Sequence, residues 1–168
     1  MTHDAIYLRE ACKIGMAESH DQHTQNGALL RTPAGYVVTA ANRFPPDVIV
    51  SAERLARPAK YQYIEHAERN VIFAAAKIGV QTHKATLYCP WFACADCARA
   101  IILAGITRVV GHVRPRQHSP ERWAESMLSA DQMLREAGVE ARSVNVAFSG
   151  PASRRIHSAA RSHRSLLG

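Results

Sequence analysis

The distribution of apolar and polar residues along the chain predicts helices that alternate with short strands. Residues 4–19 repeat apolar side chains at steps of three and four, which is typical of an amphipathic helix. Residues 27–32 and 36–40 are short apolar runs joined by Pro33 and Gly35, a pattern that predicts a β-hairpin. The chain is therefore expected to begin with a helix followed by two antiparallel strands.

The remainder of the chain repeats a simpler pattern of one helix after each strand. Residues 44–60 contain three prolines and predict a loop with room for a short helical turn. Beyond it we expect helices over 65–78, 95–104 and 120–137, each followed by a glycine, and strands over 85–89, 107–112 and 144–148. Single helices between strands favour an α/β sandwich whose sheet is parallel in its second half.

Composition narrows the class of protein. A chain of 168 residues with 47% hydrophobic and 21% charged residues suits one soluble globular domain and is too apolar for a disordered protein. No apolar run approaches the ~18–20 residues of a membrane helix, and residues 1–10 lack the apolar core of a secretory signal. We therefore expect no membrane partner and a cytoplasmic location.

The net charge of +7 is unevenly distributed. Residues 151–168 hold four arginines and no acidic residue, so we divide the chain into a domain over 1–150 and a basic C-terminal tail over 151–168. The tail is either a solvated basic end or a contact for a phosphate-bearing ligand or a neighbouring subunit.

Four side chains form the most informative pattern. His66 and Glu68 stand at the start of one expected helix, and Cys94 and Cys97 stand at the start of the next, with residues 69–92 between the two groups. One imidazole and two thiolates supply three ligands to zinc and leave a position for water, which is typical of a catalytic zinc site. A C-x-x-C segment alone also fits a redox pair or structural zinc, and a lone histidine also fits a core residue.

Glu68 favours a catalytic zinc site over a redox pair, a structural zinc site or a core histidine. Zinc lowers the pKa of its water to about 7, and a carboxylate beside it can move the water's proton to the substrate. A His-x-Glu pair followed by Cys-x-x-Cys is the signature of zinc deaminases that attack cytosine or adenine. We expect Glu68 to be the catalytic proton shuttle, and His66, Cys94 and Cys97 to be the metal ligands.

Over roughly residues 3–148 the sequence resembles the cytidine and deoxycytidylate deaminase superfamily, most closely its deoxycytidylate (dCMP) deaminase branch. The matching segments are His23–Ala28, similar to S-T-Q-V-G-A; Ala41–Pro45, similar to G-Y-N-G-x-P; Lys60–Ile72, similar to K-Y-x-Y-x-x-H-A-E-x-N-A-I; and Leu87–Val110. Free cytidine deaminases instead carry P-C-G-x-C. Here Ala93 stands where the superfamily has proline, and Arg43 replaces the usual glycine.

The resemblance implies a three-layer αβα cytidine-deaminase-like sandwich around a five-stranded mixed sheet, with one zinc per subunit. It implies hydrolysis of dCMP to dUMP and ammonia by a homo-oligomer, a hexamer or a dimer. It also implies activation by dCTP, with Mg²⁺ accompanying the regulatory nucleotide, and inhibition by dTTP.

The resemblance also points to residues on the substrate side. These are Asn42, the backbone N–H of Ala67, Asn70 and the backbone of Trp91 and Phe92, with Thr24, Gln25 and Arg43 as candidates for the phosphate or a regulatory nucleotide. Asn42 also fits a turn residue, and Asn70 a helix residue that makes only local bonds. Cys12 and Cys89 fit buried small hydrophobes.

Alternative functions remain open from the sequence. The enzyme could deaminate another cytosine nucleotide or nucleoside, or a modified pyrimidine. It could act on bases in single-stranded nucleic acid, although the core lacks the stripe of aromatic and basic residues that such binding needs, so we do not expect a nucleic-acid partner. A catalytically silent zinc fold used for binding is opposed by the intact Glu68.

Overall fold

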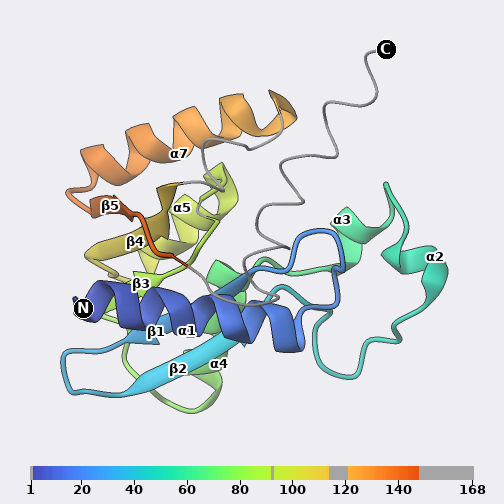
Figure 1. Cartoon of the computed structure of the whole chain (residues 1–168), viewed down its shortest axis with the longest axis horizontal. Coiled ribbons are helices and arrows are strands. Elements are labelled where there is room, and N and C mark those ends of the chain that lie inside the picture. Colours follow the sequence, from blue (N-terminus) through green and yellow to red (C-terminus); the bar gives the residue numbers. More distant parts are fainter. Residues whose placement is uncertain (1, 92, 114–120, 148–168) are drawn as a thin grey trace.

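A five-stranded sheet with helices on both faces forms the body of the molecule (Figure 1). The computed structural model describes residues 2–91, 93–113 and 121–147. The strands lie in the order β2-β1-β3-β4-β5. Their bounds are β1 Gly27–Arg31, β2 Val37–Ala41, β3 Thr86–Tyr88, β4 Arg108–His112 and β5 Glu140–Val144. The helices are α1 His3–Glu18, α2 Ala52–Leu55, α3 Lys60–Tyr63, α4 Ala67–Lys77, α5 Ala95–Leu103 and α7 Ala124–Glu136, with a 3₁₀ turn, η1, over Glu121–Trp123.

The sheet is mixed, and its strand directions follow from the connections. β1 pairs with both β2 and β3 in antiparallel fashion, whereas β3, β4 and β5 are parallel. In the described residues, α5 lies between β3 and β4, and η1 and α7 lie between β4 and β5, because a strand can return in the same direction only through a crossover. The expected sandwich and the parallel second half of the sheet are confirmed.

Successive side chains along the strands point to opposite faces of the sheet, and each face has its own hydrophobic core. Leu29 of β1 joins Leu8 of α1 in the core on one face. Its neighbours Ala28 and Leu30 point the other way and join the core formed by α4, α5 and α7. The result is three layers, with α1 alone on one face and three helices on the other (Figure 1).

Two glycines allow α1 to approach β1 unusually closely. A Cβ atom on Gly15 would lie 2.6 Å from the backbone nitrogen of Gly27, and a Cβ atom on Gly27 would overlap Ala11 O and Gly15 N. Backbone therefore packs against backbone at this crossing, where no side chain fits. The contact brings the end of α1 next to the first residue of β1.

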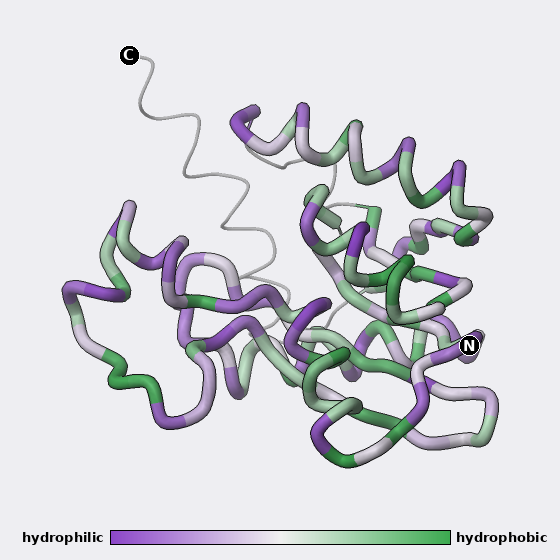
Figure 2. Tube along the Cα trace, turned by 180° about the vertical axis from the view of Figure 1, so that it is seen from behind, coloured by the Kyte–Doolittle hydropathy of each residue, from purple (hydrophilic) through white to green (hydrophobic). Residues whose placement is uncertain are grey.

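The segment between β2 and α4 is the largest excursion from the sandwich. It contains α2 and α3 and projects to one side of the molecule (Figures 1 and 2). Lys60 of α3 lies buried in an ion pair with Asp21, which belongs to the loop between α1 and β1. The pair anchors the base of the excursion to the sandwich, because breaking it would leave a buried charge without a partner.

The sequence prediction is wrong about the last strand. β5 covers Glu140–Val144, not residues 144–148, and four of its five side chains are exposed. An edge strand that buries few side chains shows no apolar pattern, so the sequence signal came from Val144 and Val146, which pack against the α1 face. Residue 148 lies outside the described residues.

The other expected elements agree with the structure to within a few residues. The excursion's short helical turn is present as α2, and the helix expected over 120–137 appears as η1 followed by α7. The helix expected from residue 65 begins at Ala67, because Glu65 forms a bridge with Arg43. In the described part of the chain, no helix combines the length and the apolar character needed to cross a membrane.

Candidate metal centre and active site

Two helix N-termini carry the predicted ligands. His66 is the N-cap residue of α4, and Cys94 is the N-cap residue of α5. Cys97 follows within the first turn of α5 and is fully buried. Because both helices begin near the carboxyl edge of the sheet, the two starts converge on one point. Helix N-termini also favour the thiolate form that binds metal.

The three ligand atoms are spaced as a tetrahedral ion requires. His66 Nδ1 lies 3.5 Å from Cys94 Sγ and 3.4 Å from Cys97 Sγ, and the two sulfurs are 3.5 Å apart. Tetrahedral zinc with ordinary bond lengths separates such atoms by roughly 3.6–3.8 Å. This His/Cys/Cys set can therefore hold zinc after shifts of a few tenths of an ångström.

Glu68 completes the site as a buried carboxylate. It lies in the first turn of α4, and its side chain is only 2% exposed. Its Oε2 atom is buried and makes no hydrogen bond with any residue in the described ranges. An unpaired buried carboxylate oxygen is costly, and such groups are typical of functional sites.

The ionisation of the site follows from its burial and its shared hydrogen bonds. Hydrogen bonding with Cys97 and His66 lowers the pKa of Cys94 to about 4. Its hydrogen bond with Cys94, together with burial, raises the pKa of Cys97. Burial raises the pKa of Glu68 to about 7. Metal binding requires both sulfurs as thiolates, so it would be coupled to the release of protons from the site.

An ion-pair chain links the starts of the two ligand-bearing helices. Glu65 Oε1 accepts hydrogen bonds from His66 N at 2.7 Å and from Arg69 Nε at 2.6 Å. The Arg69 guanidinium also lies 3.5 Å from the carboxylate of Asp96, which stands between the two cysteines. The carboxylate of Glu65 holds the N–H of His66, and Arg69 ties α4 to α5.

Sequence reasoning missed two residues that border the ligand set. The side chain of Ser126 in α7 accepts a hydrogen bond of 2.9 Å from Ala95 N, the first backbone donor of α5. The ring of Trp123 meets the His66 ring edge-on at 6.1 Å. Neither residue has a spacing that marks it in the sequence, because the chain brings both from a segment about 30 residues beyond the cysteines.

The two predicted asparagines lie together beside the end of β2. Asn42 is buried; its Oδ1 accepts bonds from Ser19 Oγ and Asn26 N, and its Nδ2 donates to Thr24 O. Asn70 Nδ2 donates to Ala41 O at 2.8 Å. The amide of Asn42 therefore holds the loop between α1 and β1, and its contact with a substrate stays a prediction.

The predicted backbone contacts differ from one another. Ala67 N, at the start of α4, donates no hydrogen bond to any residue of the described part of the chain, and it remains available to a ligand. The N–H and the C=O of Trp91 both bond to the side chain of Asn26, at 3.3 and 3.0 Å. Phe92 lies outside the described residues. Asn26, like Ser126, was not anticipated from the sequence.

The three candidates for a phosphate or a regulatory nucleotide lie in two loops. Thr24 and Gln25 belong to the loop before β1, and the Thr24 carbonyl is held by Asn42. Arg43 follows β2, and its guanidinium is 3.8 Å from the carboxylate of Glu18. With 44% of its side chain exposed, Arg43 can reach an anion in solution.

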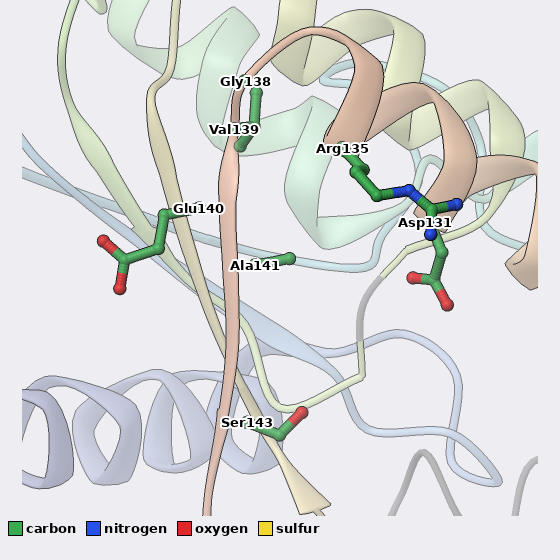
Figure 3. A pocket seen from close by; sticks show the side chains of 7 residues that line it. All are labelled: Asp131, Arg135, Gly138, Val139, Glu140, Ala141 and Ser143. Atoms are coloured by element: carbon green, nitrogen blue, oxygen red, sulfur yellow. The ribbon is translucent and has the colours of Figure 1, made fainter.

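A shallow groove lies elsewhere, between α7 and the exposed edge of β5 (Figure 3). Its lining contains none of the predicted site residues and is formed by Asp131, Arg135, Gly138, Val139, Glu140, Ala141 and Ser143. In the part of the chain that the structure describes, the three candidate ligands gather at the starts of α4 and α5, away from this groove.

Residues 1–113 match the family described as the cytidine and deoxycytidylate deaminase zinc-binding region. The chain belongs to this family. It is also 32% identical over 124 residues to an uncharacterized deaminase of Aliivibrio fischeri, covering 73% of this chain and 80% of that protein. The deoxycytidylate deaminase of Enterobacteria phage T2 is 36% identical over 75 residues, which cover 45% of this chain and only 36% of the phage enzyme.

Solved structures show the same fold. The dCMP deaminase of cyanophage S-TIM5, in complex with dCMP and dUMP, superimposes with a TM-score of 0.67 at 20% identity, covering 86% of this chain and 99% of that one. The guanine deaminase of Nitrosomonas europaea superimposes with a TM-score of 0.54 at 13% identity, covering 97% and 85%. The expected cytidine-deaminase-like αβα fold is confirmed.

Proposed function

We propose that this member of the deaminase family hydrolyses dCMP to dUMP and ammonia. The observation that carries the proposal is the buried, unpaired carboxylate of Glu68 beside a His/Cys/Cys set with tetrahedral spacing. Deamination of a cytosine ring needs a water nucleophile and a group that moves its proton to the ring and the leaving nitrogen. Glu68 is the carboxylate that the chain offers for that task.

The site residues have three roles in the proposed reaction: metal binding, proton transfer and substrate binding. His66, Cys94 and Cys97 would hold zinc, which leaves one position for water and lowers the pKa of that water to about 7. Glu68, whose own pKa is raised to about 7 by burial, is matched to accept that proton and to donate it onward at neutral pH. Ala67 stands at the start of the same helix as Glu68. Its N–H donates no hydrogen bond within the described residues and can donate to the carbonyl edge of the pyrimidine.

The choice of dCMP over other cytosine compounds is supported by the sequence pattern around the site. Asn70 and the segment Lys60–Ile72 match the deoxycytidylate branch, and the phage relatives carry that name. A monophosphate needs a cationic donor near the sugar. Arg43 can supply one, because its side chain is half-exposed and its backbone pairs with Glu65, the residue before His66. Asn42 and Asn70 flank the same strand end.

Further properties that the family resemblance implies belong to this proposal. They are assembly into a hexamer or a dimer, activation by dCTP with Mg²⁺ and inhibition by dTTP in a cytoplasmic enzyme. An enzyme that supplies dUMP benefits from feedback by deoxynucleoside triphosphates, whose concentrations its product influences.

The experiment is an ammonia-release assay on the purified zinc-loaded protein. The substrates compared are dCMP, CMP, deoxycytidine, dCTP, guanine and a single-stranded cytosine oligonucleotide. We expect dCMP to give the highest kcat/KM, at least ~10²-fold above deoxycytidine, because the phosphate adds two charge-assisted contacts. Equal efficiency on dCMP and deoxycytidine would overturn the nucleotide assignment, and turnover of guanine alone would overturn the pyrimidine assignment.

A further inference from the structure

The segment that leads from β3 to the first cysteine ligand is held on two sides. On the side of β4, Cys89 N donates to Val110 O at 3.0 Å, and His112 N donates to Pro90 O at 3.2 Å. The ladder between β3 and β4 thus continues to Pro90. Trp91 lies immediately beyond the last of these bonds and three residues before Cys94.

On the side of β1, Asn26 occupies the position opposite Trp91. The antiparallel register pairs Leu29 with Tyr88 and Leu30 with Leu87, and three further steps place Asn26 against Trp91. The backbone of Asn26 is engaged elsewhere, since its N–H donates to Asn42 Oδ1 at 2.9 Å and its C=O accepts from Asn42 N at 3.0 Å. Both backbone polar groups of Asn26 therefore bond to Asn42, on the side away from Trp91.

The side chain of Asn26 makes the bonds that its backbone does not. Nδ2 donates to Trp91 O at 3.0 Å, and Oδ1 accepts from Trp91 N at 3.3 Å. Nδ2 also lies 3.2 Å from Cys89 Sγ, and the whole residue is 6% exposed. A carboxamide presents one donor and one acceptor in a plane, as a peptide group does, so it can replace a strand neighbour.

The neighbourhood of Cys94 needs such a restraint. Ala93 precedes the ligand without the ring that would fix its φ angle, and its N–H donates no hydrogen bond within the part of the chain that the structure describes.

We propose that Asn26 is a positioning residue for the metal centre. Its amide clamps the backbone of Trp91, three residues before Cys94, and so restrains the chain ahead of the ligand turn. A proline at position 93 would restrain the same stretch by fixing its φ angle. The inference rests on the proposed function in one respect, because it requires a metal ion at His66, Cys94 and Cys97. It adds a residue that acts on the ligand turn without touching the ion.

The test measures the rate at which zinc leaves the protein for a chromophoric chelator. We expect Asn26→Val to release zinc about 10-fold faster than the unmodified protein, at the lower end of the 10–100-fold effects of residues that bond directly to a ligand, because Asn26 acts through the backbone of Trp91. Introducing Ala93→Pro into that variant should return the rate to within about threefold of the original. A residue that only stabilises the fold would not be rescued by a proline at the cysteine turn.

Thr82→Val is the matched control. Thr82 Oγ1 donates a 2.7 Å hydrogen bond to Ala104 O, just beyond the end of α5 opposite the ligands. Its loss removes a side-chain bond to the same helix, so thermal unfolding should shift while zinc release stays unchanged. Should Asn26→Val not fold, Asn26→Asp keeps the shape but turns a carboxylate oxygen toward Trp91 O, and it should release zinc faster as well.

The outcomes separate the clamp from the metal centre. Zinc bound by the unmodified protein and released at the same rate by the Asn26 variants would overturn the clamp alone. Failure of Ala93→Pro to slow the release from Asn26→Val would also overturn it. A protein that binds no zinc in any form would overturn the metal centre itself, and the clamp with it.

Discussion

At the residue scale, the chemistry of the chain depends on how Glu68 differs from the other acidic side chains. Most of them are exposed or paired with a cation, whereas Glu68 is buried with an oxygen that has no hydrogen-bond partner in the described residues. Burial disfavours its charged form and raises its pKa to about 7. A group with this pKa can both take up and deliver a proton at neutral pH.

Glu68→Gln should remove turnover while leaving the metal in place. The amide fits the same space but cannot carry a proton between water and substrate, so we expect the ammonia-release rate to fall by ~10² or more. Zinc content, measured by elemental analysis, should stay near one per chain. Loss of zinc together with activity would instead make Glu68 a metal ligand.

Cys97→Ala should remove the metal itself. Cys97 is fully buried within the ligand set, and loss of a ligand removes metal-binding free energy that contributes to folding. We expect zinc content to fall below about a tenth of that of the unmodified protein and the melting temperature to fall with it. Cys12→Ala, which empties a buried thiol position on α1, is the control and should keep its zinc. Full zinc retention in Cys97→Ala would contradict the ligand assignment.

At the scale of the elements, the position of α1 on the sheet is set by contacts at both of its ends. Near its C-terminal end the backbone of Gly15 lies against Gly27. At its N-terminal end the carboxylate of Asp4 accepts two hydrogen bonds of 2.8 Å from the Arg108 guanidinium of β4. Because β1 leads directly from Asn26, these contacts also position the clamp on Trp91.

Gly27→Ala should destabilise the protein by about 3 kcal/mol, because an added methyl group would overlap the backbone of α1 and force the helix off the sheet. Urea unfolding measures the difference. Gly79→Ala is the comparison, since Gly79 has a φ of +71° but nothing within 4 Å of its added Cβ. It should cost only about 1 kcal/mol, the price of the left-handed backbone alone. Equal costs at the two positions would contradict the close approach.

Asp4→Asn should lower stability in a way that depends on pH. The hydrogen bonds from Arg108 hold the pKa of Asp4 below its usual 3.8, so the folded state favours the carboxylate. Loss of the two hydrogen bonds between charged groups should cost about 2 kcal/mol at neutral pH. The part that comes from the lowered pKa is fully present above the unfolded pKa and is lost as the pH falls through the folded value. The unfolding free energies of the two proteins should therefore differ most above pH ~5 and approach each other as the pH falls below the usual carboxyl pKa.

The control for that measurement is Glu10→Gln on the same helix. The Glu10–Lys13 pair is exposed, and pairs of this kind contribute little. Its unfolding free energy should stay within about 0.5 kcal/mol of the unmodified protein at every pH. A constant difference for Asp4→Asn across the pH range would show that the effect of that substitution is not ionic.

At the scale of the whole molecule, a net charge of +7 affects how an anionic substrate is bound. Added salt should lower kcat/KM for dCMP more than for deoxycytidine, because only the nucleotide depends on screened charge. Removing residues 151–168 should leave the preference for dCMP within about threefold, since the ligand set and its neighbours lie between Asn26 and Ser126. Loss of the preference in the shortened protein would place the phosphate contact in the basic tail.

Most of the fold, and the three residues that meet as a candidate metal site, could be predicted from the sequence. Buried strands and amphipathic helices repeat their side chains with a period, and turn glycines end the helices, so these elements appear in the pattern. The His66–Glu68 and Cys94–Cys97 spacings follow from the geometry of one helical turn, which the sequence contains in full.

The distant residues that support the site could not be predicted, because they meet it through tertiary contacts. The exposed edge strand β5 has no apolar period, and the partners of the ligand turns, Asn26 and Ser126, come from β1 and α7. Asn26 stands within a matched motif, yet its use as a strand neighbour follows from the register between β1 and β3. Such contacts depend on where separate elements meet in space, and local spacing along a chain does not encode that meeting.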